Sequence, residues 1–351
     1  MKKVLYITNI ESPYRVKFFN LLAEQCDLTV LYEREKSANR NAEWAKSETC
    51  NHNRIFLKGI AVGMENSFSL RILKEILKPY DAIIVGCYNS PVQMFAMLVM
   101  RLFGIRFMIN LDGEPFLEGN GLKTQLKRFF LKGAQAYLVA GEKAAESLRH
   151  AWGDCEIVPY YFSSLTELEL QEHREAAKNC QRNDTILVVG QYFDYKGMDI
   201  ALQAARMDRE HYYKFVGMGS RTEQFCNDFA GQIPPDVEII PFLQKKELEE
   251  EYRKCAMLVL PSRQECWGLV VNEAASFGTP IVSTWGSGAA VEFLADHYPQ
   301  YLAQPSDAES LLKCIQICMT AEDTEQYATF LKNKSKDYSI ERSVQVHIDV
   351  L

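Results

Sequence analysis

Short apolar runs alternate with helical patterns along most of the chain. Residues 4–8 form an apolar run, and the apolar side chains of 14–24 recur at helical spacing. The alternation continues through apolar runs at 28–32, 82–86, 106–110 and 136–140 and helical patterns at 69–77, 91–103, 122–132 and 143–152. Apolar runs of this length, separated by helices, are typical of a parallel sheet covered on both faces. The first part of the chain therefore predicts one α/β domain.

The alternation restarts near residue 185. A connector is predicted at 159–183, where Pro159, Ser163 and Ser164 precede a charged stretch. Beyond it we predict strands at 186–189, 213–216, 237–240, 257–260 and 280–283, and helices at 198–206, 221–229, 245–255, 307–319, 324–333 and 340–351. Both halves have the Rossmann-like pattern. We place the domains at 1–165 and 166–335, followed by a C-terminal helical segment at 336–351.

Composition agrees with a two-domain globular enzyme of 351 residues, 47% of them hydrophobic and 24% charged. The ten cysteines are scattered without a CxxC pair, and the six histidines show no cluster, so we expect a reducing cytoplasm and no metal site. The apolar start is too short for a signal peptide. Residues 92–109 carry Arg101 and Arg106 and are shorter than a membrane span, which needs about 20 apolar residues.

Charge is spread unevenly along the chain. The net charge of −7 divides into +4 for residues 1–165 and −11 for the remainder. An acidic half repels phosphate, which argues against nucleic acid as a partner. The mildly basic first half is compatible with contact to an anionic membrane and equally with a solvated surface.

Two carboxylates, Glu265 and Glu273, mark a strand–loop–helix–strand unit at 257–284. Glu265 lies in the loop after the first strand, and Gly268 opens the helix that carries Glu273. Loops at the carboxyl ends of parallel strands are where open α/β sheets bind ligands, and free N–H groups at a helix start favour phosphates or sugar hydroxyls. Glu273 can accept two hydrogen bonds from a vicinal diol such as a ribose. The alternative is a pair of surface carboxylates on an ordinary helix.

This unit resembles the E-x7-E signature of the retaining family 4 glycosyltransferases, with Trp267 where Phe is commoner. The resemblance extends over most of the chain and is strongest at 186–295. It implies the GT-B fold, in which two Rossmann-like domains face each other across a cleft and the last helix, 340–351, returns to the first domain. It also implies a nucleotide-sugar donor of the UDP or GDP type and no metal. The donor contacts would include Cys266, Trp267, Gly268 and Leu269.

Further donor residues are implied by the segment GQYFDYKGMD at 190–199. Family members usually carry Gly-Arg-x4-Lys-Gly there, so the resemblance makes Lys196 a ligand of the donor phosphates, whereas Gln191 replaces the usual Arg. An exposed lysine at a turn is the alternative.

Two neighbouring loops resemble the family's nucleotide loops. Gly217 belongs to the Val-Gly-x-Gly loop, although a third glycine for a dinucleotide fingerprint is missing. Phe242 and Leu243 correspond to the residues that hold the nucleobase, and a core role for Phe242 is the alternative.

In the first domain, residues 9–15 lack the Gly-Gly pair that many family members place beside the donor phosphate. Ser12, Tyr14 or Arg15 are the candidates to replace it, through acceptor or phosphate recognition. A salt bridge at a helix start is the alternative for Arg15. Asp112 corresponds to a His that contacts the donor sugar, and it can accept a hydrogen bond from a sugar or acceptor hydroxyl; a structural Asp-Gly turn is the alternative.

A basic amphipathic helix is predicted around Lys123, Lys127, Arg128 and Lys132. The resemblance implies a membrane-facing, acceptor-side surface, and a solvated basic face is the alternative.

The resemblance implies a retaining glycosyltransferase that moves a sugar from a nucleotide diphosphate to a glycan or lipid-linked acceptor, in bacterial surface polysaccharide synthesis. In the family's usual proposal, Lys196 and the N–H groups near Gly268 stabilise the leaving diphosphate, Glu265 orients the sugar, and the leaving phosphate accepts the proton. A non-catalytic glycosyltransferase-like subunit and another GT-B enzyme, such as a nucleotide-sugar epimerase, remain as alternatives.

Overall fold

The computed structural model describes residues 1–35, 49–62, 66–86, 88–113, 121–152, 155–178 and 180–351, and the side chains of Leu122, Lys123 and Lys127 also lie outside the described part. The chain divides into two compact units. The first contains Met1–Tyr161 together with Ile340–Leu351, and the second contains Phe162–Ser339. The sequence had placed these divisions at 165/166 and 335/336.

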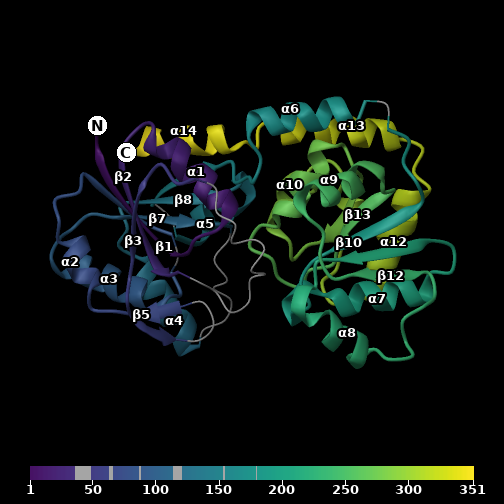
Figure 1. Cartoon of the computed structure of the whole chain (residues 1–351), viewed down its shortest axis with the longest axis horizontal. Helices are drawn as coiled ribbons and strands as arrows, with labels where there is room; N and C mark the ends of the chain where they lie inside the picture. The colour runs from purple at the N-terminus through teal and green to yellow at the C-terminus, as the bar shows by residue number, and fades with distance from the viewer. Residues whose placement is uncertain (36–48, 63–65, 87, 114–120, 153–154, 179) are drawn as a thin grey trace. The chain divides into compact units, whose positions relative to one another are not determined.

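The first unit is built on a parallel sheet of seven strands (Figure 1). β1 (Lys3–Ile10) pairs with β2 (Asp27–Arg34) on one side and with β6 (Ala82–Val85) on the other, so that Val4 faces both Leu28 and Ala82. The full order is β3-β2-β1-β6-β7-β8-β9. The remaining strands are β3 (Asn53–Phe56), β7 (Met108–Leu111), β8 (Ala136–Ala140) and β9 (Glu156–Tyr160). The strand order therefore reverses between β1 and β6.

Helices cover both faces of this sheet. One face packs on α2 (Ile72–Ile76), α3 (Pro91–Leu102), α4 (Leu122–Leu131) and α5 (Glu142–Trp152) through one apolar cluster. The other packs on α1 (Pro13–Ala23) and α14 (Ile340–Val350) through a second cluster, and these two helices lie side by side (Figure 1). A small antiparallel hairpin joins β4 (Ile60–Val62) and β5 (Asn66–Phe68).

The second unit repeats this plan with six parallel strands. β10 (Thr185–Val189) and β13 (Met257–Leu260) are neighbours at its centre, although about 70 residues of chain separate them. The order is β12-β11-β10-β13-β14-β15, completed by β11 (Tyr212–Val216), β12 (Val237–Ile240), β14 (Ile281–Thr284) and β15 (Leu302–Ala303). The order reverses between β10 and β13. In open α/β sheets such a reversal opens a crevice at the carboxyl ends of the two strands.

The helices of the second unit form two groups. α7 (Met198–Met207) packs against α12 (Ala308–Met319) on one side of the sheet, where α8 (Thr222–Asp228) also lies. On the other side, α10 (Leu269–Ser276) contacts α6 (Glu167–Ala176), α9 (Lys245–Lys254), α11 (Gly288–Leu294) and α13 (Thr324–Ser335) (Figure 1).

The two Rossmann-like sheets predicted from the sequence are confirmed, and the predicted strands and helices have counterparts within a few residues of their expected ends. The interpretation of 159–183 as a plain connector is wrong in two places. β9 occupies its start, and its Pro159 is tolerated because β9 is the last strand of the sheet. α6 occupies its middle.

Within the described residues, no helix is both long and apolar enough to pass through a membrane.

Candidate functional site

Lys196 and Glu265 meet at the carboxyl ends of the two central strands of the second unit. Lys196 follows β10, Glu265 follows β13, and the Lys196 Nζ forms an ion pair with Glu265 Oε2. Only 20% of the lysine side chain and 15% of the glutamate side chain are exposed. This point, where the strand order reverses, is the place at which an open sheet binds ligands. We refer to it as the Lys196–Glu265 site.

The turn that carries Lys196 requires the glycine after it. Asp194–Lys196 forms a short 3-10 turn, and Gly197 follows with φ of +67°. A Cβ on Gly197 would lie 2.0 Å from the carbonyl oxygen of Pro261. Glycine is thus needed both for the left-handed backbone and for the close approach of this turn to the end of β13.

The loop that carries Glu265 is held by the loop after β14. Glu265 pairs with Ser287 as an isolated parallel bridge. Its N–H donates to the carbonyl of Gly286 at 2.8 Å, and its own carbonyl accepts from the Gly288 N–H at 3.1 Å. Gly268, with φ of +103°, then starts α10. The backbone on both sides of Glu265 is therefore fixed by main-chain bonds.

The residues after Glu265 differ in their accessibility. Cys266 is exposed and Leu269 is half-buried, whereas Trp267 is 3% exposed. The indole Nε1 of Trp267 donates to Asn272 Oδ1 at 2.8 Å, and Asn272 Nδ2 donates to the carbonyl of Phe162 at 3.0 Å. The indole of Trp267 thus packs inside the unit, and the donor contact expected of this residue stays a prediction.

The remaining predicted donor residues line the same edge of the sheet. Gln191 follows β10, Gly217 follows β11, and Phe242 and Leu243 follow β12, the last two half-buried. Gly217 has φ of +98° and donates its N–H to the carbonyl of Ile240 at 3.2 Å, which ties the ends of β11 and β12 together.

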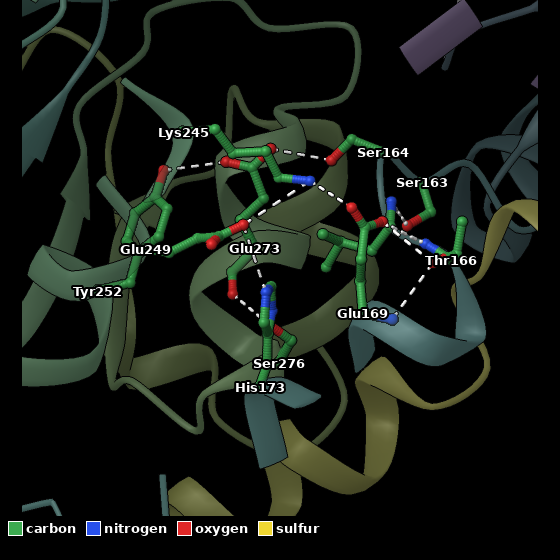
Figure 2. Close-up of polar contacts among 11 residues, drawn as sticks. Ser163, Ser164, Thr166, Glu169, His173, Lys245, Glu249, Tyr252, Glu273 and Ser276 are labelled. Carbon is green, nitrogen blue, oxygen red and sulfur yellow. Dashed lines mark hydrogen bonds and ion pairs between the residues drawn. The ribbon is translucent and has the colours of Figure 1, made fainter. Parts of the chain in front are cut away.

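Glu273 lies on α10 inside a network of polar contacts (Figure 2). Ser164 Oγ donates to its Oε1 at 2.9 Å, and the Tyr252 hydroxyl donates to its Oε2 at 3.1 Å. Burial raises the pKa of the Glu273 carboxyl, and the two hydroxyls and the charge of Lys245 oppose this effect only in part. Glu273 therefore has hydrogen-bond partners of its own, the hydroxyls of Ser164 and Tyr252.

The cation of this network is Lys245. Its Nζ donates to Glu169 Oε1 at 2.5 Å and lies 3.7 Å from Glu249 Oε1 (Figure 2). Burial lowers the pKa of Lys245, but the neighbouring carboxylates outweigh burial and the net shift is upward. His173 stacks on Phe277, and its Nδ1 lies 2.8 Å from Ser276 Oγ.

In the first unit, Arg15 forms an ion pair with Asp112. Arg15 Nη2 contacts both carboxylate oxygens, at 2.6 and 2.5 Å, and Nη1 donates to the Tyr6 hydroxyl at 3.0 Å. Arg15 is 7% exposed, whereas 31% of the Asp112 side chain is exposed. Burial lowers the pKa of the guanidinium, the charge of Asp112 raises it, and the net shift is upward. The helix-start salt bridge considered for Arg15 is thus present.

A buried hydrogen-bond network extends from Asp112 to α14. The Tyr160 hydroxyl donates to Asp112 Oδ1 at 3.0 Å and accepts from Asn110 Nδ2 at 2.9 Å. Nε2 of His347, on α14, lies 2.9 Å from Oδ1 of Asn110. Burial raises the pKa of Tyr6, whose hydroxyl donates to Asn110 Oδ1 at 2.6 Å, to about 12.

The two other candidates in the first unit lie at the start of α1. Ser12 is 3% exposed and occupies the N-cap position, and its carbonyl accepts from the Val16 N–H at 2.9 Å. Tyr14 is half-buried, with its ring 6.0 Å from the Arg15 guanidinium carbon.

Several residues of these sites were missed by the sequence analysis. Arg263 and Asp199, which tie the two loops of the Lys196–Glu265 site, carried no signal beyond their closeness to it in sequence. α6, which supplies Glu169, does have a signal, because Thr166 and Glu169 form a capping box. Among the described residues, no group of three or more His, Cys, Asp or Glu side chains is arranged to hold a metal ion.

Comparison with known proteins identifies the family. Residues 170–337 match the family model of the glycosyl transferases group 1. An uncharacterized glycosyltransferase of Haemophilus influenzae is 30% identical over 280 residues, which cover 78% of this chain and 77% of that protein.

Solved structures share the fold along the full length of the chain. The sucrose-phosphate synthase of Thermosynechococcus elongatus superposes with a TM-score of 0.74 at 15% identity, covering 100% of this chain and 98% of that chain. HepE of Anabaena, solved in complex with UDP-glucose, superposes with a TM-score of 0.68 at 14% identity, covering 100% of both chains. The chain therefore belongs to the group 1 glycosyltransferases and has the GT-B fold.

Proposed function

We propose that this glycosyltransferase is a retaining enzyme of family 4 that moves a sugar from a nucleotide diphosphate to a hydroxyl of a glycan or lipid-linked acceptor. The observation that carries the proposal is the pairing of Lys196 with Glu265 where the strand order of the second sheet reverses. A cation and a carboxylate in that position suit the two parts of a sugar donor, its diphosphate and its sugar hydroxyls.

In this mechanism the bond between the anomeric carbon and the diphosphate breaks while negative charge develops on the leaving group. The Lys196 ammonium and the N–H groups at the start of α10 stabilise that charge, which is electrostatic catalysis. On donor binding, the diphosphate replaces Glu265 as the partner of Lys196, and Glu265 accepts hydrogen bonds from the sugar. The acceptor hydroxyl attacks the same face of the sugar and gives its proton to the leaving phosphate.

The other residues of the second unit would recognise the nucleotide. Glu273 accepts from the ribose hydroxyls, since a buried carboxylate already bonded to hydroxyl groups has the chemistry needed for a diol. Phe242 and Leu243 contact the base, and Gln191 donates a neutral hydrogen bond. The donor is of the UDP or GDP type, and the UDP-glucose complex of HepE favours the first. No metal is required, because Lys196 supplies the positive charge.

On the acceptor side, Asp112 is the better supported residue of the first unit. Its carboxylate is fixed by Arg15 and Tyr160 and is still 31% exposed, so it can accept a hydrogen bond from an acceptor hydroxyl. Arg15 is buried, which supports a role in orienting Asp112 more than direct phosphate binding. We further propose that the protein acts in the cytoplasm, in surface polysaccharide synthesis, with peripheral contact to an anionic membrane.

Substitution of Lys196 tests this function directly. We expect the unmodified protein to bind a UDP- or GDP-sugar in calorimetry and to release the nucleoside diphosphate. We expect Lys196→Ala to lower kcat/KM by about 10²–10³-fold, the size of effect seen when one donor to a developing anion is removed.

Lys214→Ala is the matched control. Lys214 also lies in the second unit, is 17% exposed and pairs with Glu251, but it sits within β11 and away from the carboxyl ends of the strands. Normal donor binding by Lys196→Ala would contradict the assignment of Lys196. Binding without turnover in the unmodified protein, across a panel of acceptors, would favour a non-catalytic subunit.

A further inference from the structure

Arg263 joins the two loops that carry Lys196 and Glu265. Its Nη1 donates to the carbonyl of Asp194 at 2.6 Å, and its Nη1 and Nη2 form a bidentate ion pair with Asp199, at 2.8 and 2.6 Å. Its Nε donates to Ser306 Oγ at 3.1 Å. The guanidinium thus bonds to the residue two positions before Lys196 and to the residue three positions after it.

The backbone strengthens the same connection. The N–H groups of Arg263 and Gln264 both donate to the carbonyl of Tyr195, at 2.9 and 3.1 Å. Lys196 therefore lies in a turn that is tied to the Glu265 loop at three points, the carbonyls of Asp194 and Tyr195 and the carboxylate of Asp199. Substitution of Arg263 removes only the two connections that its side chain makes, to the carbonyl of Asp194 and to Asp199. The backbone bonds to Tyr195 remain.

We propose that Arg263 is a positioning residue for sugar transfer, which holds the Lys196 ammonium in register with Glu265 and with the donor diphosphate. The inference rests on the proposed function, because that function gives Lys196 its ligand. Four of the five guanidinium N–H groups already bond to the protein, which favours an action of Arg263 through Lys196 over direct contact with the donor. A displacement of about 1 Å in such a group can cost about 10²-fold in rate.

A double-mutant cycle between Arg263→Met and Lys196→Ala tests the proposal. We expect Arg263→Met alone to lower kcat/KM for the donor by about 10–10²-fold. In the Lys196→Ala background the same change should lower it by less than about threefold, because the group that Arg263 positions is absent. A merely structural role predicts the same loss in both backgrounds.

The matched control is Arg253→Met. Arg253 also makes a bidentate ion pair in the second unit, with Glu250 at 2.8 and 2.6 Å, but both residues belong to α9. We expect it to leave kcat/KM unchanged. Arg263→Lys should lose part of the activity, because an ammonium keeps the charge but cannot form the forked contact with Asp199.

Hydrogen exchange gives a readout that does not depend on turnover. The N–H groups of Lys196 and Gly197 bond within the turn, to the carbonyls of Phe193 and Asp194. They should exchange faster in Arg263→Met and not in Arg253→Met.

Three results would overturn the positioning role. Equal losses in the two backgrounds of the cycle, or unchanged exchange at Lys196 and Gly197, would overturn it while leaving the proposed function in place. Failure of the unmodified protein to bind any nucleotide sugar would refute the proposed function itself, and the positioning role with it.

Discussion

Glu273 illustrates at the scale of one residue how a proposed donor-binding group can weaken the fold. Its carboxyl has a raised pKa because burial disfavours the charge, although Ser164, Lys245 and Tyr252 all favour it. A carboxyl whose pKa is higher in the folded than in the unfolded chain binds more protons when folded. The free energy of unfolding therefore falls as the pH rises through the pKa of the folded state. Above the pKa of the folded state, the ionised Glu273 therefore lowers stability relative to a pH at which its carboxyl is protonated.

Glu273→Gln should consequently separate stability from donor binding. The neutral amide keeps the shape and removes the buried charge, so we expect a higher midpoint of urea unfolding at pH 7 and little difference at a pH where the carboxyl is protonated. Donor affinity should fall about tenfold, since an amide accepts less well from ribose hydroxyls. Glu238→Gln, at a side chain that is 42% exposed, is the control and should change neither quantity. A variant that is less stable at pH 7 would contradict this account.

Lys196 and Glu265 could be predicted to lie at one donor site, because each follows an apolar strand and both belong to segments that carry the family resemblance. Their direct ion pair was not predicted. Strand ends in a parallel sheet lie at one edge, so the residues after them converge. Arg263 was beyond such reasoning, because its contacts with Asp199 and the Asp194 carbonyl depend on how two loops fold over that edge. Trp267 shows the converse. It matches the family's motif, yet its indole is buried against Asn272.

At the scale of elements, α14 is attached to the first unit by a buried histidine. His347 Nδ1 lies 2.7 Å from the carbonyl of Ser343, and Nε2 lies 2.9 Å from the amide of Asn110, at β7. Phe18 of α1 and Tyr160 of β9 pack edge-on against its ring. Burial lowers the pKa of His347 from 6.5 to about 4.

The lowered pKa of His347 predicts that the free energy of unfolding of the first unit, around α14, depends on pH. Between pH 6.5 and about 4 the unfolded chain binds a proton at His347 that the folded chain does not, so the free energy of unfolding decreases as the pH falls. The slope is at most about 1.4 kcal/mol per pH unit for one group. We expect His347→Gln to lower stability at pH 7 and to reduce this slope. Hydrogen exchange of the β7 and α14 amides at increasing urea concentration would measure both effects.

His52 provides the comparison, because burial also lowers its pKa to about 4 in the same unit. His52→Gln should reduce the slope by a similar amount, and the double variant should show both reductions. If the free energy of unfolding of His347→Gln had the same slope with pH as that of the unmodified protein, the imidazole would already be protonated in the folded unit between pH 6.5 and about 4.

The helix that the sequence analysis missed, α6, went undetected for a physical reason. α6 has few apolar residues, and among its side chains only Leu170 and His173 are buried. Its order comes from the capping box of Thr166 and from the ion pair of Glu169 with Lys245, which is 76 residues away. Hydrophobic periodicity cannot detect such a helix, whereas it detected α7 and α12 because each buries an apolar face.

At the scale of the whole molecule, the division into two Rossmann-like units followed from the repeated alternation of apolar runs and helices. This alternation did not predict which unit the C-terminal residues join. The last residues, Ile340–Leu351, belong with the first 161, because Ile340 and Val344 complete the apolar cluster on α1. The sequence indicated this return only through its resemblance to a family, since an amphipathic helix does not itself specify which sheet it covers.

The surface of the first unit also carries an apolar and basic patch. Leu102 and Phe103 at the end of α3 are 75% and 70% exposed, and Leu126 and Phe129 on α4 are 47% and 48% exposed. Arg101 holds the two helices together, with Nη1 donating to the carbonyl of Phe129 at 2.8 Å and its guanidinium 4.6 Å from that ring.

Exposed basic side chains lie close to these residues in sequence, namely those of Arg106, Arg128 and Lys132. Apolar side chains among cations suit the interface of an anionic bilayer, where each basic residue contributes about 1 kcal/mol. The side chains of Lys123 and Lys127, which the sequence analysis added to this face, lie outside the described residues.

We therefore expect the purified protein to float with vesicles that contain anionic phospholipid and not with neutral vesicles, and to be released by added salt. Phe103→Ser should reduce flotation severalfold while leaving donor turnover with a water-soluble acceptor unchanged, because Phe103 lies at the far end of α3 from the predicted acceptor residues at the strand ends. Leu168→Ser, at a leucine of the second unit that is 64% exposed, is the control for loss of one exposed apolar side chain. Equal flotation of the two variants would show that the patch does not mediate membrane binding. Flotation that persists at high salt would assign the contact to apolar insertion without help from the basic residues.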